Sequence, residues 1–157
     1  MSSNLSLPNL LQADQPILMG IVNLTPDSFY DGGYSLSELK EQIADFESAS
    51  VDIIDLGAES SRPGATPITF DEEIERLSPA LDYIKAHSNA FISIDTYKPE
   101  TASFALENGA DLINDITGGE SSALLQVVAD HNAGIVLMHK QGTPESMQKK
   151  PTYSNVV

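Results

Sequence analysis

Short apolar runs alternate along the chain with longer segments in which apolar residues recur at helical spacing. The apolar runs are nearly continuous, and this pattern is typical of strands in a parallel sheet that is covered on both faces. We predict strands at five places: Ile17–Val22, Ile53–Leu56, Phe91–Ile94, Leu112–Asn114 and Ile135–Met138.

The segments between these strands carry the start and stop signals of helices. Glu72 follows Thr69 at the spacing of a capping box, and Gly109 provides a stop for the helix before it. We predict helix starts at Ser37, at Thr69, at Pro99 and at Ser121 or Ser122.

This β-α order predicts an α/β fold, for which two architectures fit. One is a (β/α)8 TIM barrel, present here only as an N-terminal five-strand portion, and the other is a doubly wound sheet. A complete barrel needs roughly 200 residues or more, whereas the chain has 157. The barrel interpretation therefore requires that about three β-α units are absent. It treats residues 1–157 as a single, C-terminally truncated domain.

The amino-acid composition excludes several classes of function. The 23 acidic and 8 basic residues give a net charge of −15, and we expect no nucleic-acid partner because binding to phosphates requires clustered Lys and Arg. The chain has no cysteine, which excludes disulfides, thiolate metal sites and cysteine nucleophiles. We find neither an apolar run of membrane-spanning length nor a signal-peptide pattern. We therefore expect a cytoplasmic protein without a membrane partner.

Polar residues follow the carboxyl ends of the predicted strands, where both architectures gather function. The first two strands are followed by the long segments 23–33 and 57–65, and later strands end in Asp95, Asn114 and His139. Structural roles are also possible: Asp95 could cap the next helix, Asn114 could satisfy strand-end backbone groups, and Glu59 could pair with Arg62. Long loops together with a polar residue at each strand end favour a functional site.

Five segments in this order resemble a known family. They are Met19–Phe29 with Asp31–Gly33, Asp55–Gly64, Ile94–Thr96, Asn114–Ile116, and Leu137–Pro144 with Met147-Gln148. Together they resemble the signatures of dihydropteroate synthases, the folate-pathway transferases that sulfonamides target. The resemblance implies a barrel that binds 6-hydroxymethyl-7,8-dihydropterin diphosphate in its mouth, with Mg²⁺ as cofactor and p-aminobenzoate as the second substrate. It also implies a homodimer for the full-length protein.

The resemblance implies roles for individual residues in three groups. The catalytic residues would be Asn23, Asp31 and Asp95, with Asn23 also the Mg²⁺ ligand. The pterin would lie against Asp95, Asn114, Ile116 and Met138. The loop residues near p-aminobenzoate and the diphosphate would be Phe29, Ser61, Arg62 and Pro63.

Two alternatives stay open at this point. A pterin-binding barrel of the methyltransferase type would bind folates without responding to p-aminobenzoate, and a non-catalytic fragment or scaffold partner would bind no pterin. We expect the 157-residue chain to be inactive alone, because the family's later strands supply a second pterin-binding Asp, a Lys and an anion site. We also expect it to be marginally folded or self-associating, because an unclosed sheet leaves its edges unpaired.

Overall fold

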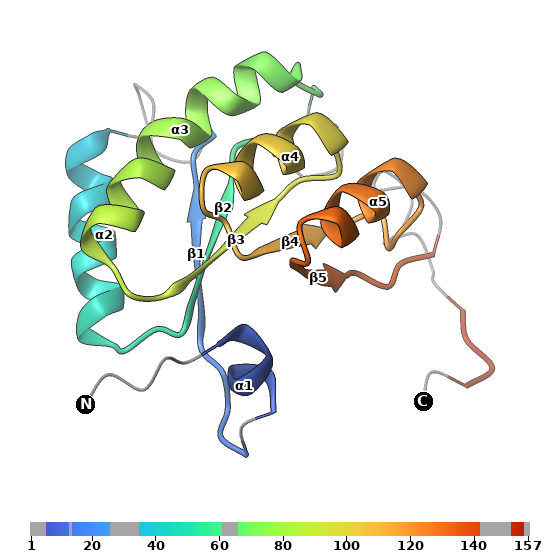
Figure 1. Ribbon diagram of the computed structural model, residues 1–157, viewed down its shortest axis with the longest axis horizontal. Helices are drawn as coiled ribbons and strands as arrows, with labels where there is room; N and C mark the ends of the chain where they lie inside the picture. Colours follow the sequence, from blue (N-terminus) through green and yellow to red (C-terminus); the bar gives the residue numbers. More distant parts are fainter. Residues whose placement is uncertain (1–5, 13, 26–34, 61–65, 142–151, 156–157) are drawn as a thin grey trace.

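Five parallel strands form one sheet in the computed structural model, which describes residues 6–12, 14–25, 35–60, 66–141 and 152–155. The strands are β1 (Met19–Asn23), β2 (Ile53–Gly57), β3 (Phe91–Asp95), β4 (Leu112–Asp115) and β5 (Gly134–Leu137). The helices are α1 (Leu7–Leu11), α2 (Leu36–Ser48), α3 (Phe70–His87), α4 (Pro99–Glu107) and α5 (Ser122–Asp130), drawn in Figure 1. The five predicted strands are confirmed, with bounds that shift by at most two residues.

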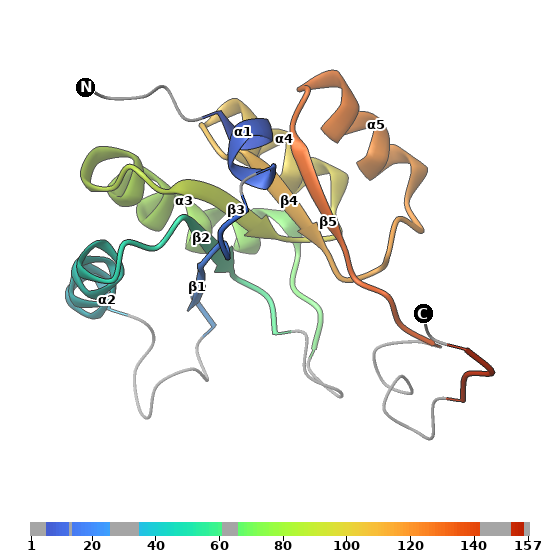
Figure 2. The same ribbon diagram turned by 90° about the horizontal axis from the view of Figure 1, so that it is seen from below.

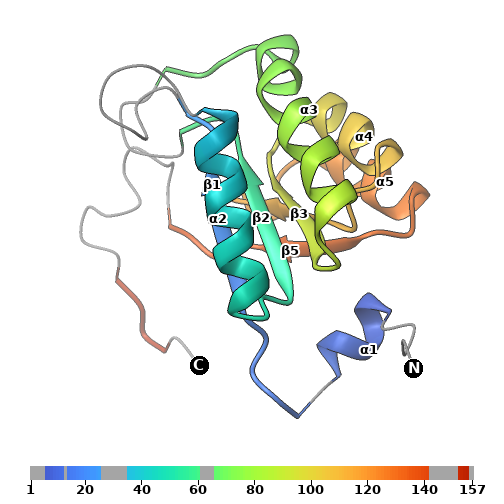
Figure 3. The ribbon, with the colours of Figure 1, turned by 90° about the vertical axis from the view of Figure 1, so that its left-hand side faces the viewer.

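The order of the strands decides between the two architectures. Each strand pairs in parallel with its neighbour in sequence, giving the order β1-β2-β3-β4-β5. A doubly wound sheet would reverse this order at a switch point and would carry helices on both faces. Here α2 to α5 follow one another along the same face (Figures 2 and 3), and their buried residues form one cluster with that face. The fold is therefore a five-strand portion of a (β/α)8 barrel.

The two faces of the sheet pack against different elements. On β2, Ile54 and Leu56 belong to the buried cluster that α2 to α5 complete. Ile53 belongs instead to a second cluster with Leu10 of α1, which lies at the amino-terminal end of the sheet (Figure 1). Because side chains two apart on a strand share a face, Asp55 points to the same side as Ile53, away from the outer helices. This side of the sheet becomes the interior of a barrel.

The start of α3 is confirmed as predicted. The Thr69 hydroxyl accepts the Glu72 N–H at 3.3 Å, and the Glu72 carboxylate accepts the Thr69 N–H at 2.9 Å. This reciprocal capping box satisfies two backbone donors that have no partner inside the helix.

The predicted start of α2 at Ser37 is wrong, because Ser35 is the N-cap. The Ser35 hydroxyl accepts the Glu38 N–H at 3.3 Å, and the Glu38 carboxylate accepts the Ser35 N–H at 2.9 Å. The residue three positions after Ser37 is Lys40, whose side chain cannot accept a backbone N–H and so cannot complete the box. Of the two serines proposed for α5, Ser121 is the cap.

Within the described part of the chain, no helix combines the length and the apolar character needed to cross a membrane.

Candidate functional site at the carboxyl edge of the sheet

The strand register places the predicted site residues in one row. Asn23 of β1 pairs with Gly57 of β2, Gly57 pairs with Asp95 of β3, and Asp95 pairs with Asn114 of β4. Register partners on neighbouring strands share a face, so the row lies on the interior face, at the carboxyl edge. A Cβ placed on Gly57 would lie 3.6 Å from Asn23 Oδ1 and 3.5 Å from Asp95 Oδ2. The two oxygens therefore flank the same small space above Gly57.

Asp95 is the most electrostatically strained group in this row. Burial, as the largest cause, together with the nearby carboxylates of Asp55, Glu73, Glu59 and Asp115, raises the pKa of its carboxyl from 3.8 to about 7. A pKa near neutrality at a site of this kind is typical of a binding or catalytic group. The alternative in which Asp95 caps the next helix does not hold, because α4 has Lys98 as N-cap and no side-chain cap bond.

Asn114 has a partner below the row. Its Nδ2 donates to Asp55 Oδ2 at 3.1 Å. The side chain therefore binds another side chain, and the alternative in which Asn114 serves only backbone groups at the strand end does not hold. Asp55 is 4% exposed and lies in the middle of β2. The sequence argument did not single out Asp55, although a charged residue inside an apolar strand was a signal that could have found it.

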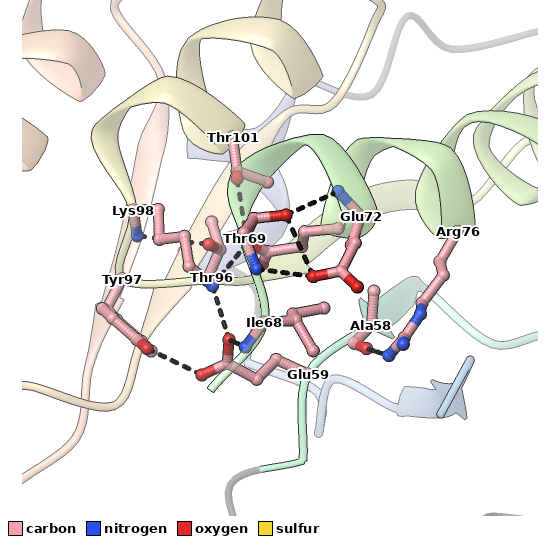
Figure 4. A network of polar contacts seen from close by, with 11 residues as sticks. Ala58, Glu59, Ile68, Thr69, Glu72, Arg76, Thr96, Tyr97, Lys98 and Thr101 are labelled. Atoms are coloured by element: carbon pink, nitrogen blue, oxygen red, sulfur yellow. Dashed lines mark hydrogen bonds and ion pairs between the residues drawn. The ribbon is translucent and has the colours of Figure 1, made fainter. Parts of the chain in front are cut away.

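A buried ion-pair network supports the row from the outer side (Figure 4). Lys98 Nζ contacts Glu59 Oε2 at 2.5 Å and Glu73 Oε2 at 2.9 Å. Thr101 Oγ1 also donates to Glu73 Oε2 at 2.9 Å, and Tyr97 donates its hydroxyl to Glu59 Oε1 at 2.7 Å. Arg62, which we predicted as the possible partner of Glu59, lies outside the described residues. In the described part of the chain, Lys98 is the cation that pairs with Glu59.

Burial and hydrogen bonding act in opposite directions on this network. Burial alone would raise the pKa of Glu59, but hydrogen bonds from Lys98, from Tyr97 and from the Ile68 amide outweigh it and hold the pKa below its usual value. Burial alone would lower the pKa of Lys98, but its hydrogen bonds to the two glutamates raise it. Both members of the pair therefore stay charged at neutral pH.

Two apolar residues that we predicted to pack against the pterin, Ile116 and Met138, directly follow β4 and β5. Ile116 is half-buried and lines a small pocket together with Asp95 and Tyr97. Met138 is also half-buried, and its N–H donates to the Asp115 carbonyl at 3.1 Å. The two side chains thus lie just beyond the row of polar residues, after β4 and β5.

The turn after β4 fixes the position of Met138. The Asp115 carboxylate accepts the Thr117 N–H at 2.7 Å and the Gly119 N–H at 2.8 Å. Gly118 has φ +74°, and a Cβ on it would lie 2.7 Å from the Met138 carbonyl oxygen. Glycine is required there both for its backbone conformation and for this close approach.

Two alanine substitutions separate these requirements. We expect Gly119→Ala, at φ +86° with no contact nearer than 3.7 Å, to cost roughly 1 kcal/mol of unfolding free energy from backbone strain alone. Gly118→Ala adds the clash with Met138 and is expected to cost about 2 to 4 kcal/mol. Urea unfolding of both variants measures the difference. Equal losses would contradict the proposed close contact.

Five predicted site residues lie outside the described residues. They are Phe29, Asp31, Ser61, Arg62 and Pro63.

The donors for a divalent cation are sparse in the described segments. Asn23 offers an exposed side-chain amide oxygen, which suits a hard cation such as Mg²⁺. In those segments no group of three or more His, Cys, Asp or Glu side chains is placed to hold a metal ion. The residues fit Mg²⁺ only as an ion that takes most of its ligands from water and substrate phosphate. The surrounding carboxylates, which raise the pKa of Asp95, would favour a cation beside the row.

A polar row at the carboxyl edge of consecutive parallel β-α units is the arrangement of a ligand-binding (β/α)8 barrel. Residues 19–157 match the family described as "Pterin binding enzyme". The chain therefore belongs to the pterin binding enzymes.

Curated relatives agree with this assignment. The dihydropteroate synthase of Escherichia coli (strain K12) is 39% identical over 148 residues, which cover 93% of this chain and 52% of that protein. The dihydropteroate synthase of Synechocystis sp. is 41% identical over 143 residues, covering 89% of this chain and 50% of the relative. The chain thus spans about half the length of these relatives.

Solved structures give the same result. The Yersinia pestis dihydropteroate synthase in complex with a sulfonamide drug superposes with a TM-score of 0.80 at 37% identity, covering 89% of this chain and 52% of that chain. The Xanthomonas albilineans dihydropteroate synthase with 4-aminobenzoic acid gives a TM-score of 0.74 at 37% identity, covering 92% of this chain and 51% of that chain.

Proposed function

We propose that this chain carries the pterin-binding part of a dihydropteroate synthase. The reaction condenses 6-hydroxymethyl-7,8-dihydropterin diphosphate with p-aminobenzoate and gives 7,8-dihydropteroate and diphosphate. The observation that carries the proposal is the row of Asn23, Asp95 and Asn114 at the carboxyl edge. Relatives that are about 40% identical and named dihydropteroate synthase support it.

The pterin is recognised by complementary hydrogen bonds. The Asp95 carboxylate accepts the exocyclic amino group and a ring N–H, which is a charge-assisted pairing. Asn114 offers an amide oxygen as an additional acceptor. Ile116 and Met138 pack against the faces of the ring. A flat, donor-rich heterocycle is therefore the ligand that this part of the edge suits.

The reaction breaks the bond between the pterin methylene carbon and the diphosphate oxygen and forms a bond from that carbon to the amine nitrogen. Positive charge develops on the pterin as the diphosphate departs, and the ionised Asp95 carboxylate stabilises it. The neutral aniline-type nitrogen attacks with its own lone pair and loses its proton afterwards. Asn23 would hold Mg²⁺, which would supply charge stabilisation for the departing diphosphate.

The remaining predicted residues complete the proposal. Phe29, Ser61 and Pro63 would contact p-aminobenzoate, Arg62 would meet the diphosphate, and Asp31 would act in catalysis. The cytoplasmic location and the homodimer of a full-length protein stay predictions.

Calorimetric titration tests the pterin site directly. We expect the chain to bind the pterin diphosphate in the presence of Mg²⁺ and more weakly after chelation. Asp95→Ala removes a charged acceptor, so we expect it to weaken binding by about ten- to a hundredfold. The matched control is Asp82→Ala, because Asp82 is an exposed aspartate of α3 and its removal should leave binding unchanged. Equal effects of the two substitutions would contradict the assignment of Asp95.

Product formation distinguishes the synthase from the other pterin proteins. Because the chain spans about half of its relatives, we expect turnover only in a longer polypeptide that continues through the rest of the barrel. p-Aminobenzoate should bind there only together with diphosphate or the pterin substrate. Pterin binding without any response to p-aminobenzoate would favour a methyltransferase-type protein. No pterin binding in either polypeptide would favour a non-catalytic role.

A further inference from the structure

Asp55 is a buried carboxylate one layer below the candidate site. It is 4% exposed and lies on the interior face of β2, two residues before Gly57 of the row. Its register partner on β3 is Ser93, which is fully buried on the same face. A charged group in the middle of a strand is costly to desolvate, so its position requires an explanation.

Hydrogen bonding to Asp55 offsets only part of this desolvation cost, because only one of its two carboxylate oxygens has a partner among the described residues. Oδ2 accepts the Asn114 Nδ2–H at 3.1 Å. Oδ1 is buried and, among the described residues, has no hydrogen-bond partner. An apolar residue of similar volume would fill this position without the unsatisfied atom, and such replacements are often neutral or stabilising. A gain in stability therefore does not explain a carboxylate at this position, and this favours a role in the site above.

The contact decides which way the Asn114 amide faces. A side-chain amide can turn by half a rotation and exchange its oxygen and nitrogen, since the two groups have almost the same shape. An ionised carboxylate has no proton to donate, so Asp55 accepts only the Nδ2 end of the amide. The Asn114 oxygen is then left as the end that faces away from Asp55, beside Asp95 in the row.

We infer that Asp55 is a positioning residue for ligand recognition, which holds the Asn114 amide so that its oxygen is presented to the ligand as an acceptor. The inference rests on the proposed pterin site and deepens it. Two adjacent acceptors, the Asp95 carboxylate and the Asn114 oxygen, select a heterocycle that carries adjacent N–H donors. A turned amide would set an N–H group against those donors, and unpaired polar groups of this kind strongly penalise the wrong ligand.

A double-mutant cycle tests whether Asp55 acts through Asn114. We expect Asp55→Leu to weaken binding of the pterin diphosphate by about tenfold, because the amide loses the acceptor that orients it. Asp55→Asn keeps an acceptor oxygen but adds N–H donors that would accommodate the turned amide as well, so it should recover only part of that loss. At pH 8, where the Asp95 carboxylate is ionised, the same Asp55→Leu change in an Asn114→Ala background should alter the affinity by less than about twofold, because no amide is left to orient.

Ser93→Ala provides the matched control. Ser93 is the register partner of Asp55 and is also buried, but its hydroxyl has no hydrogen-bond partner among the described residues. Its removal should therefore leave pterin affinity unchanged. A loss from Asp55→Leu that is equally large with and without Asn114 would overturn the inference. A loss from Ser93→Ala as large as that from Asp55→Leu would also overturn it, since general loosening of the strand would then explain both.

A measurement on the parent chain covers the case in which a variant does not fold. In ¹⁵N-edited NMR spectra, we expect the two Asn114 side-chain N–H signals to be well separated, with one shifted by its bond to the carboxylate. Two unshifted signals that exchange rapidly would overturn the inference without any substitution at Asp55. Absence of pterin binding by the parent chain would refute the proposed function alone, because these amide signals would still report on Asp55 and Asn114.

Discussion

Replacing Lys98 with methionine is expected to lower the free energy of unfolding by about 3 to 5 kcal/mol. Lys98 contacts Glu59 and Glu73, and the side chain of Glu73 is only 1% exposed. Methionine would fill the volume of the lysine stem but would leave two carboxylates in the interior without their cation. Breaking a buried ion pair by removing one partner is much more costly than replacing the pair as a whole.

The controls separate charge from packing. Lys40 lies on the exposed surface of α2 and has a cation–π contact with Tyr83 at 5.6 Å, so Lys40→Met should change the unfolding free energy by no more than about 1 kcal/mol. Adding Glu73→Met to Lys98→Met should recover much of the lost stability, because the most buried carboxylate would then also be gone. Chemical unfolding of the three variants measures these differences. A small loss from Lys98→Met, or no recovery in the double variant, would contradict this account of the network.

The same network has a direct connection to the site. Glu59 and Glu73 line the small pocket beside Asp95, and their carboxylates are among the charges that raise its pKa. Glu59 also accepts the Ile68 N–H at 3.0 Å, which ties the end of β2 to the segment that leads into α3. Lys98 therefore balances charges that would otherwise bear more strongly on Asp95.

The strands and most helix starts could be predicted because their signals are local. An apolar run such as Ile53-Ile54 marks a buried strand, and Thr69 with Glu72 marks a helix start within four residues. The sequence predicts that the residues of the row lie at strand ends, but it does not predict which of them are neighbours. The pairing of Asn23 with Gly57 and of Gly57 with Asp95 depends on the tertiary fold.

The buried charges were missed because their partners are distant in sequence. Glu73 is separated from Lys98 by 25 positions, and Asp55 is separated from Asn114 by 59. Each carried a weak signal: Glu73 lies one helical turn before Leu77 on the buried face of α3, and Asp55 interrupts an apolar strand. Such signals show that a charge is buried, but they do not identify the group that compensates for it.

Asp95→Asn is expected to make the chain more stable than its parent at pH 8, by as much as roughly 4 kcal/mol. The pKa of Asp95 is raised from 3.8 to about 7 by burial and by the neighbouring carboxylates. As the pH rises from about 4 to about 7, the unfolded chain loses this proton first, so ionisation of Asp95 progressively destabilises the folded state. Asparagine carries no such penalty. The advantage of the variant should therefore vanish near pH 4 and reach its full size above pH 7.

Pterin binding should respond in the opposite direction, if the ligand donates its N–H groups to the ionised carboxylate as proposed. Below pH 7 the parent chain must release a proton from Asp95 before it binds, so its affinity should fall by up to about tenfold per pH unit. Asp95→Asn should bind weakly and with little dependence on pH, because an amide offers one neutral acceptor at every pH. Asp82→Asn, at an exposed position of α3, should change neither property. Calorimetry and urea unfolding between pH 4 and 8 measure both effects on the same samples. A less stable Asp95→Asn variant at pH 8 would show that the neighbouring carboxylates do not strain Asp95, whereas a stable variant that binds normally would remove Asp95 from the pterin site.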